Sequence, residues 1–142
     1  MLSIKFVREN KDVVKASEKR RDHDPKVVDQ VLSSDESWRS EKTKLQDLQK
    51  ERNTVSEEIN KLMKQKKKDK AQVKIKEMKQ LVEDLKAQEE KTNTLKKERD
   101  TLLKQIGNVL EDSVPKGKSE DDNPTIKEVG KKPVFNFPIK DH

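Results

Sequence analysis

The chain has 142 residues, of which 44% are charged and only 28% hydrophobic, and its formal net charge is +6. One domain is the default at this length, and the apolar side chains are too few for a wide core around an enclosed active site. Cysteine is absent from the sequence, which excludes disulfides and thiolate metal sites. Apolar runs of membrane-spanning length and a signal peptide are not visible, so we expect a cytoplasmic protein without a membrane partner.

Residues 1–37 precede the periodic part of the chain and are predicted to form a small base. Apolar and polar side chains alternate from Leu2 to Val7, which predicts a short strand. Asn10 can cap a helix that runs to about Arg21. The narrow packing face of this helix would consist of Val13, Val14 and Ser17.

A second helix start is predicted at Asp24 and Pro25, because aspartate caps helices and proline suits the first helical position. An apolar patch follows and should lead from the base into a long helix. Its members are Val27, Val28, Val31 and Leu32.

Two long segments repeat apolar residues at alternating steps of three and four, from Trp38 to Lys66 and from Met78 to Val109. Folding the chain at Lys70 pairs the two patterns, as an antiparallel coiled coil requires. The predicted fold is all-α: a long antiparallel two-helix coiled-coil hairpin on a small helical base, with short extended segments at the termini. The hairpin, or arm, would comprise helices over 38–66 and 71–107 joined by a tip at 67–70. The apolar pairs are Leu62 with Met78, Ile59 with Leu81, Val55 with Leu85, Leu45 with Leu95, and Trp38 with Leu102.

Polar residues also face one another in this register. Polar residues in a seam often specify its alignment, and we favour this role over direct contact of Arg52 with a ligand. Exposed pairs of opposite charge would support the same alignment. The seam pairs are Glu41 with Arg99 and Arg52 with Gln88, and the exposed pairs are Lys44 with Glu98 and Glu51 with Lys91.

Positive charge is concentrated where the arm turns, since Lys61 to Lys79 contains nine lysines against Asp69 and Glu77. Such a cluster commonly contacts nucleic acid. The alternative is that a solvated turn collects lysines for solubility.

The two exposed sides of the arm also differ in charge. The side formed by heptad positions e and b, here called the basic side, has an excess of four positive charges. The side formed by positions g and c, the acidic side, has an excess of three negative charges. We therefore hypothesise that a polyanion lies along the basic side. The candidate contacts there and at the tip are Arg39, Lys42, Asn53, Asn60, Lys67, Lys68, Lys79, Lys86 and Lys96.

No residue pattern indicates catalysis or metal binding. His23 and His142 are isolated in the sequence, and three glycines cannot supply a phosphate-binding loop. Trp38 is interpreted as a packing anchor rather than a stacking platform. The sequence therefore predicts no catalytic residue, metal ligand or cofactor site in this chain.

Residues 113–142 are predicted to be a linker outside the arm domain, which would cover residues 1–112. Proline and glycine at Pro115, Gly117, Pro124 and Gly130 indicate loops. Phe135, Phe137 and Ile139 alternate like a strand that has no partner in this chain. This pattern suggests a chain cut from something longer.

Several short motifs together resemble the N-terminal part of seryl-tRNA synthetases. They are the opening run Met1–Asn10, Trp38-Arg39, Glu51-Arg52-Asn53, Ile106-Gly107-Asn108, and Ser113-Val114-Pro115 followed by Gly117 and Asn123. The resemblance covers essentially the whole chain, and the combination is specific although each motif alone is weak.

The resemblance implies a coiled-coil arm that grips the long variable arm of serine tRNA and directs its acceptor end to the active site of a partner subunit. It also implies that residues 113–142 lead into a class II catalytic domain that this chain lacks, so the chain alone would not activate serine. ATP and Mg²⁺ would serve the full-length enzyme. Because the family's dimer is held mainly by the catalytic domain, the isolated chain is expected to be monomeric.

Two other functions stay open. A helical-hairpin adaptor or chaperone-like arm ranks second, since exposed apolar residues near Lys66–Lys70 are scarce and client-binding tips usually need them. A stand-alone enzyme ranks third, because neither a pocket nor a catalytic constellation is visible.

Overall fold

The computed structural model describes residues 1–117, 119–131 and 133–138, and strands are absent from these ranges, which confirms the all-α prediction. The chain divides into two units, Met1–Leu110 and Glu111–His142, and each is described by itself. Among the described residues, no helix combines the length and the apolar content needed to cross a membrane. The helices are α1 (Ile4–Glu9), α2 (Lys11–Arg20), α3 (Lys26–Lys64), α4 (Lys68–Leu103) and the short 3₁₀ helix η1 (Glu120–Asp122).

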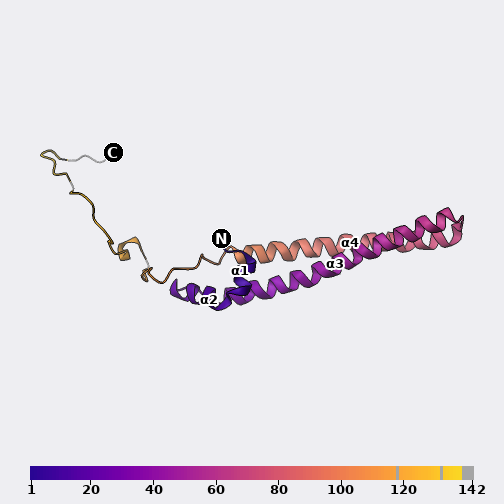
Figure 1. Ribbon diagram of the computed structural model, residues 1–142, viewed down its shortest axis with the longest axis horizontal. Helices are drawn as coiled ribbons and strands as arrows, with labels where there is room; N and C mark the ends of the chain where they lie inside the picture. Colours follow the sequence, from indigo (N-terminus) through magenta and orange to yellow (C-terminus); the bar gives the residue numbers. More distant parts are fainter. Residues whose placement is uncertain (118, 132, 139–142) are drawn as a thin grey trace. The chain divides into compact units, whose positions relative to one another are not determined.

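Two long helices, α3 with 39 residues and α4 with 36, dominate the first unit and lie side by side as the predicted hairpin (Figure 1). α3 is continuous from Lys26, so the arm helix expected to begin at Trp38 already starts within the base. α4 ends at Leu103 rather than near Gly107. One unbroken helix therefore connects the base to the far end of the arm.

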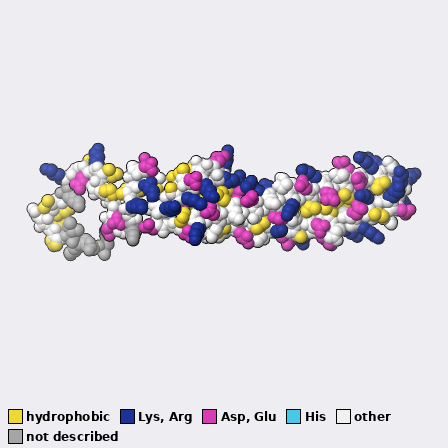
Figure 2. Space-filling view, turned by 90° about the horizontal axis from the view of Figure 1, so that it is seen from below, with side chains coloured by type: hydrophobic (Ala, Val, Ile, Leu, Met, Phe, Trp, Pro, Cys, Tyr) yellow, Lys and Arg dark blue, Asp and Glu magenta, His cyan; other side chains and the backbone are white. Residues whose placement is uncertain are grey.

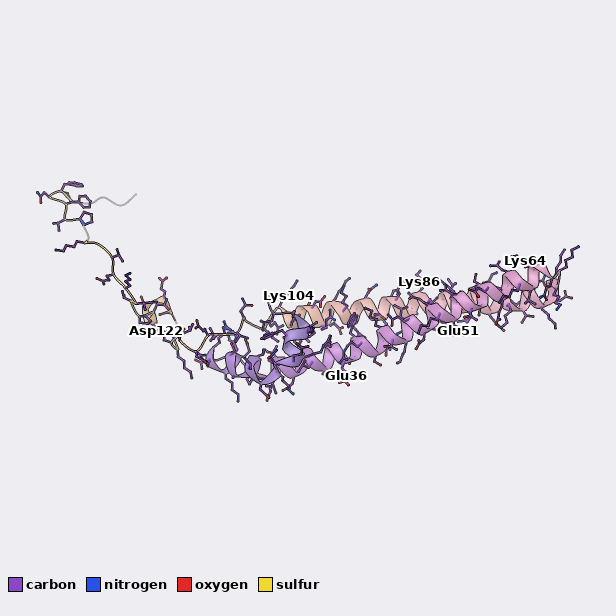
Figure 3. The ribbon with its side chains drawn as sticks, in the orientation of Figure 1. Glu36, Glu51, Lys64, Lys86, Lys104 and Asp122 are labelled. Carbon is purple, nitrogen blue, oxygen red and sulfur yellow. The ribbon has the colours of Figure 1, made fainter. Side chains whose placement is uncertain are left out.

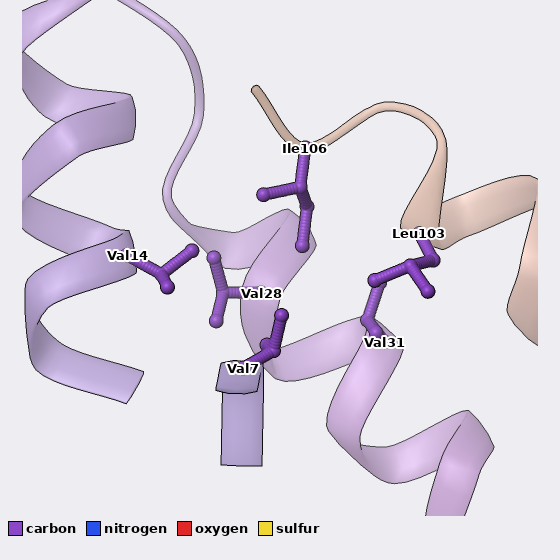
Figure 4. Packing of buried hydrophobic residues seen from close by; sticks show 6 residues of the cluster. All are labelled: Val7, Val14, Val28, Val31, Leu103 and Ile106. Carbon is purple, nitrogen blue, oxygen red and sulfur yellow. The ribbon is translucent and has the colours of Figure 1, made fainter. Parts of the chain in front are cut away.

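The base closes around a small aliphatic cluster, here called the basal core, in which side chains from α1, α2, α3, the end of α4 and the segment just after it point toward one another (Figure 4). Four of its valines have no exposed surface. This burial is the main source of stability in the base, at about 1.5–3 kcal/mol for each large aliphatic side chain. The members of the basal core are Val7, Val14, Val28, Val31, Leu103 and Ile106.

The strand predicted over Leu2–Val7 is wrong, because this segment forms α1. The Ser3 hydroxyl accepts a hydrogen bond from the Phe6 main-chain N–H at 3.2 Å and caps the helix. Ile4 and Val7, three residues apart, then share one helical face and pack on the basal core. The apolar residues of so short a segment fit the alternation of a strand and the spacing of a helix equally well. The residues that it packs against therefore decide which of the two it forms.

α2 occupies the predicted range, and Val14 and Ser17 are buried as expected. Val13, in contrast, is 49% exposed, so it does not belong to the packing face. Asn10 is the N-cap residue of α2, but its side chain donates to the Phe6 carbonyl at 3.2 Å instead of capping α2. Asp24 does cap the start of α3, since its Oδ1 accepts from the Lys26 N–H at 2.9 Å.

Glu18 of α2 is buried and fastens the chain beyond α4 to the base. Its Oε1 accepts from the Gly107 N–H at 3.0 Å, and its Oε2 lies 2.9 Å from Nδ1 of His23. His23 is therefore a structural partner of Glu18 and not an isolated residue. A Cβ at Gly107 would lie 2.5 Å from Nη1 of Arg21, so a larger residue here would have to displace the guanidinium of Arg21.

The seam of the arm contains nearly all the side chains that the periodicity predicts. Arg52, Lys66 and Val109 are the exceptions, since all three are exposed. The buried and half-buried seam residues are Trp38, Glu41, Leu45, Leu48, Val55, Ile59 and Leu62 of α3, and Met78, Leu81, Leu85, Gln88, Thr92, Leu95, Arg99 and Leu102 of α4.

The register predicted for this seam is wrong. The chain turns over residues 65–67 rather than around Lys70, and Gln88 bonds Glu41 instead of lying opposite Arg52. The difference amounts to about one heptad, roughly seven residues. A shift of one heptad returns every seam residue to the seam, so apolar periodicity cannot distinguish the two registers.

The hairpin turn is made without glycine. Lys66 adopts φ 59°, the left-handed conformation that usually favours glycine. The Lys67 N–H donates to the Leu62 carbonyl and the Lys66 N–H to the Met63 carbonyl, both at 3.0 Å, which is the Schellman pattern of a helix C-terminus. α4 begins immediately afterwards, so the last three residues of the predicted tip, 68–70, form its first turn.

The second unit contains η1 and irregular segments. Ser119 caps η1 through a capping box, in which its hydroxyl accepts from the Asp121 N–H at 3.3 Å and its own N–H donates to Asp122 Oδ2 at 3.2 Å. Residues 133–138 do not form the expected strand, and Ile139 of that prediction lies outside the described residues. The rings of Phe135 and Phe137 lie 5.2 Å apart.

Candidate nucleic-acid interface

All nine side chains predicted to contact a polyanion are exposed in the structure. Because the register differs by a whole heptad, each keeps its place on the basic side or at the tip. The six lysines among them, Lys42, Lys67, Lys68, Lys79, Lys86 and Lys96, form no ion pair within the described ranges of the chain. Their charge is therefore available to a partner.

Lysine and arginine side chains gather at the end of the arm where α3 meets α4 (Figure 2). Lys64 lies at this end, while Lys86 and Glu51 lie midway along the arm (Figure 3). Lys67 precedes α4 and Lys68 is its first residue, so the positive end of the α4 dipole adds to the lysine charge. The turn thus presents concentrated positive charge.

A polar cluster near the base of the arm fixes its register around Glu41. Gln88 donates through Nε2 to Glu41 Oε2 at 2.7 Å and to the Glu41 carbonyl at 3.0 Å. Lys44 lies 2.9 Å and Lys91 3.2 Å from the same carboxylate. Gln88, Lys44 and Lys91 together lower the pKa of Glu41 to about 2. Lys44 and Lys91 therefore meet Glu41 and not their predicted partners Glu98 and Glu51.

A second polar cluster joins the base to the arm around Asp35, whose side chain is 1% exposed. Arg8 of α1 approaches it through Nε at 2.8 Å, and Arg39 of α3 through Nε at 3.1 Å. Arg99 of α4 approaches through Nη1 at 3.3 Å. The expected partner of Arg99 was Glu41, so this pairing is corrected as well.

Trp38 packs at this junction, as its interpretation as an anchor predicts. The guanidinium carbon of Arg99 lies 4.3 Å and Nζ of Lys42 4.8 Å from the ring centroid. Both cations are within the range of cation–π attraction. Arg39 and Lys42, two of the predicted contacts, are therefore held at defined positions, unlike the lysines farther along the arm.

The acidic side of the arm contains a shallow groove between α3 and α4. Serines and leucines, among them Ser33, Ser37 and Leu95, form its walls. Carboxylates stand along it at Asp29, Glu36, Glu41 and Glu98. Asp29 and Glu41 are paired with lysines, whereas Glu36 and Glu98 add negative charge, so the groove is a less favourable surface for a polyanion than the basic side.

Sequence reasoning missed the cluster around Asp35, including the contribution of Arg8. Asp35 occupies the e position of its heptad, and an aspartate at this position is expected to be an ordinary exposed charge. Only the folding of α1 against α3 encloses it. The sequence offered one indirect signal, namely that Arg99 at a seam position requires a buried anion.

Of the remaining predicted residues, Asn53 accepts a hydrogen bond from Arg52 Nη2 at 2.9 Å, and Asn60 is exposed without a described contact. Groups of three or more side chains suited to hold a metal ion are not found among the described residues.

The basal core, the long hairpin and its two unlike sides define an antiparallel coiled-coil arm domain. The family model for the seryl-tRNA synthetase N-terminal domain matches residues 1–110. The chain belongs to this family.

Relatives from distant organisms match the whole chain. It is 37% identical over 144 residues to a serine–tRNA ligase of Methanoregula boonei and 37% identical over 142 residues to one of Staphylococcus haemolyticus. Each match covers 100% of this chain and 33% of the relative, so the chain spans about a third of their length.

Two solved structures have a similar fold. One is a seryl-tRNA synthetase from Pyrococcus horikoshii complexed with ATP, with a TM-score of 0.73, 33% identity and coverage of 86% of this chain and 27% of that one. The other is a cytoplasmic serine–tRNA ligase from Naegleria fowleri in complex with AMP, with a TM-score of 0.74, 26% identity and coverage of 92% and 35%.

Proposed function

We propose that this chain is the tRNA-binding arm of a seryl-tRNA synthetase. It grips the long variable arm of serine tRNA and positions it for serylation by a catalytic domain outside this chain. The observation that carries the proposal is the contrast between a basic side, whose lysines form no ion pair with the described residues, and an acidic side on the same arm. Solubility alone would not require such a division of charge.

The physics of RNA recognition suits this arrangement. Side chains cannot read the deep, narrow major groove of A-form RNA, so a rigid helical arm that contacts phosphates and follows shape is an effective reader. Lysines neutralise phosphates and release counterions. Each such contact adds roughly 0.7–0.9 to the slope of log affinity against log salt concentration.

The proposal assigns the chemistry to other parts of the enzyme. The ATP and Mg²⁺ that the family resemblance implies would act in the catalytic domain, and this chain would supply affinity and orientation. We further propose that the isolated chain is monomeric and that the enzyme acts in the cytoplasm.

The deciding experiment measures binding of the chain to serine tRNA, with and without the long variable arm, across a salt series. We expect removal of that RNA arm to abolish most of the binding. Equal affinity for both RNAs would reduce the basic side to a non-specific polyanion surface and contradict the proposal.

Charge reversal maps the interface. Replacing Lys79, Lys86 and Lys96 with glutamate should abolish binding to serine tRNA. The matched control replaces Lys50, Lys76 and Lys97, which are also exposed but lie on the outer faces of the two helices. An equal or larger loss in the control would show that the basic side is not the binding surface.

One observation favours the protein-binding alternative. Exposed apolar side chains are not scarce near the turn as expected, since Met63 is 53%, Val73 59% and Ile75 38% exposed. A helical-hairpin adaptor would use them as contacts. Absence of RNA binding at low salt would place this function first.

A further inference from the structure

We infer that the base of the arm holds a preorganised phosphate site formed by Arg8, Arg39 and Lys42 and positioned by Asp35. The inference rests on the proposed function, because the ligand would be a phosphodiester group of the bound RNA. It adds a contact at the base to those expected along the arm.

The site is built on one enclosed carboxylate. Oδ2 of Asp35 faces Nε of Arg8 at 2.8 Å and Nε of Arg39 at 3.1 Å, while Oδ1 accepts from Nη2 of Arg8 and Nη1 of Arg99, both at 3.3 Å. Arg8 and Arg39 come from different helices and meet at a single oxygen atom. Their guanidinium groups are therefore held next to each other.

The bonds to Asp35 leave other guanidinium donors of Arg8 and Arg39 without a hydrogen bond in the part of the chain that the structure describes. A guanidinium has five N–H donors. Arg39 uses Nε, so both of its Nη atoms stay available, and Arg8 uses Nε and Nη2, so its Nη1 does. The side chains are 51% exposed for Arg39 and 37% for Arg8. A phosphate can accept from such edges through paired hydrogen bonds.

The charge balance also favours an anion. Arg99 is 8% exposed and divides its bonds between the buried Asp35 and the half-exposed Asp100, so Arg99 and Asp35 form the buried part of the cluster. Arg8 and Arg39 then bring two further positive charges to a carboxylate that Arg99 already faces. A bound phosphate would neutralise this excess.

Lys42 supplies the third contact. It follows Arg39 by three residues on α3, so the two side chains are neighbours on the helix surface. Its Nζ lies 4.8 Å from the ring centroid of Trp38, which restrains it. A restrained side chain loses less conformational entropy on binding than a freely rotating lysine does.

Single substitutions test the site by titration against serine tRNA at several salt concentrations. Arg39→Gln and Arg8→Gln should each weaken binding about tenfold, the value of one charge-assisted hydrogen-bonded contact. Each should also lower the salt slope by roughly 0.7–0.9. The control, Lys97→Gln, removes an exposed positive charge nearby from the outer face of α4 and should change the dissociation constant less than about twofold.

A second pair of variants separates positioning from charge. Asp35→Asn adds net positive charge, so binding should strengthen if charge alone matters and weaken if Asp35 orients the arginines. Arg39→Lys keeps the positive charge but loses the paired N–H donors of the guanidinium group. It should therefore bind more tightly than Arg39→Gln but more weakly than the wild-type chain. Circular dichroism melting identifies any variant that has lost its fold, and Arg39→Lys keeps the test valid if Asp35→Asn does not fold.

The outcomes distinguish this inference from the proposed function. If the wild-type chain binds serine tRNA through its variable arm but Arg8→Gln and Arg39→Gln behave like Lys97→Gln, the base site is refuted and the arm function stands. If the wild-type chain shows no preference for the variable arm, both are refuted.

Discussion

The basal core and the seam of the arm use the same aliphatic residue types but bury them to different extents. Val28 and Val31 in the basal core have no exposed surface, whereas Val55 and Leu85 in the seam keep 8% and 9%. The basal core is enclosed by four helical segments, while each seam residue has only one facing helix. Folding stability should therefore be concentrated in the base. Most side chains of the arm, in contrast, are exposed to solvent.

The largest expected effect comes from the junction between the two regions. Asp35→Ala leaves Arg8, Arg39 and Arg99 without their carboxylate, and breaking a buried ion pair costs about 3–5 kcal/mol. Urea unfolding followed by circular dichroism measures the loss. The control is Asp47→Ala, which removes a 65% exposed carboxylate paired with Lys50 and should cost less than about 1 kcal/mol. Similar losses would show that the junction is not a stability centre.

A matched pair of valines tests the comparison directly. Val31→Ala in the basal core should destabilise the chain by about 2 kcal/mol, because it removes two buried methyl groups and leaves a cavity. Val55→Ala in the seam should cost about 1 kcal/mol, since a two-helix layer can relax around the change. The same unfolding experiment gives both values. An equal or larger cost at Val55 would overturn the assignment of stability to the base.

The smallest effect concerns the arm alone and depends on pH. The pKa of Glu41 is lowered to about 2, so its contribution is fully present above the unfolded pKa near 4.5 and is lost as the pH falls toward 2. The melting temperature of the wild-type chain should therefore fall more between pH 5 and pH 2 than that of Glu41→Gln. Glu57→Gln, at an exposed position, should follow the wild-type profile. Parallel profiles for wild type and Glu41→Gln would contradict the role of this cluster.

Much of the arm could be predicted from periodicity. A two-helix seam needs apolar residues at alternating steps of three and four, and this spacing is visible in the sequence. The register could not be predicted, since the apolar pattern permits alignments one heptad apart. The observed alignment instead depends on the hydrogen bond between Gln88 and Glu41 and on the ion pair between Arg99 and Asp35. Which side chains pair in this way depends on their individual geometry, which the apolar pattern does not contain.

The turn and the N-terminus escaped prediction for related reasons. The Schellman turn has Lys66 where glycine is the usual signal, and a second such turn after α2 has Asp22 at φ 58°. α1 is too short for its sequence pattern to favour helix over strand. The basic side was predicted because side membership survives a heptad shift, whereas Arg8 was not, because its proximity to Asp35 exists only after α1 folds.

The continuity of α3 has a mechanical consequence. Its 39 residues extend for about 58 Å at about 1.5 Å per residue, and its first turns belong to the basal core. The base therefore holds one end of a long rigid helix, and the hairpin turn lies at the other end. A tilt of about 5° at the base would move the far end by roughly 5 Å, close to one helical turn of 5.4 Å. Small repacking among the basal valines would therefore redirect the lysines at the turn by the distance between successive phosphates.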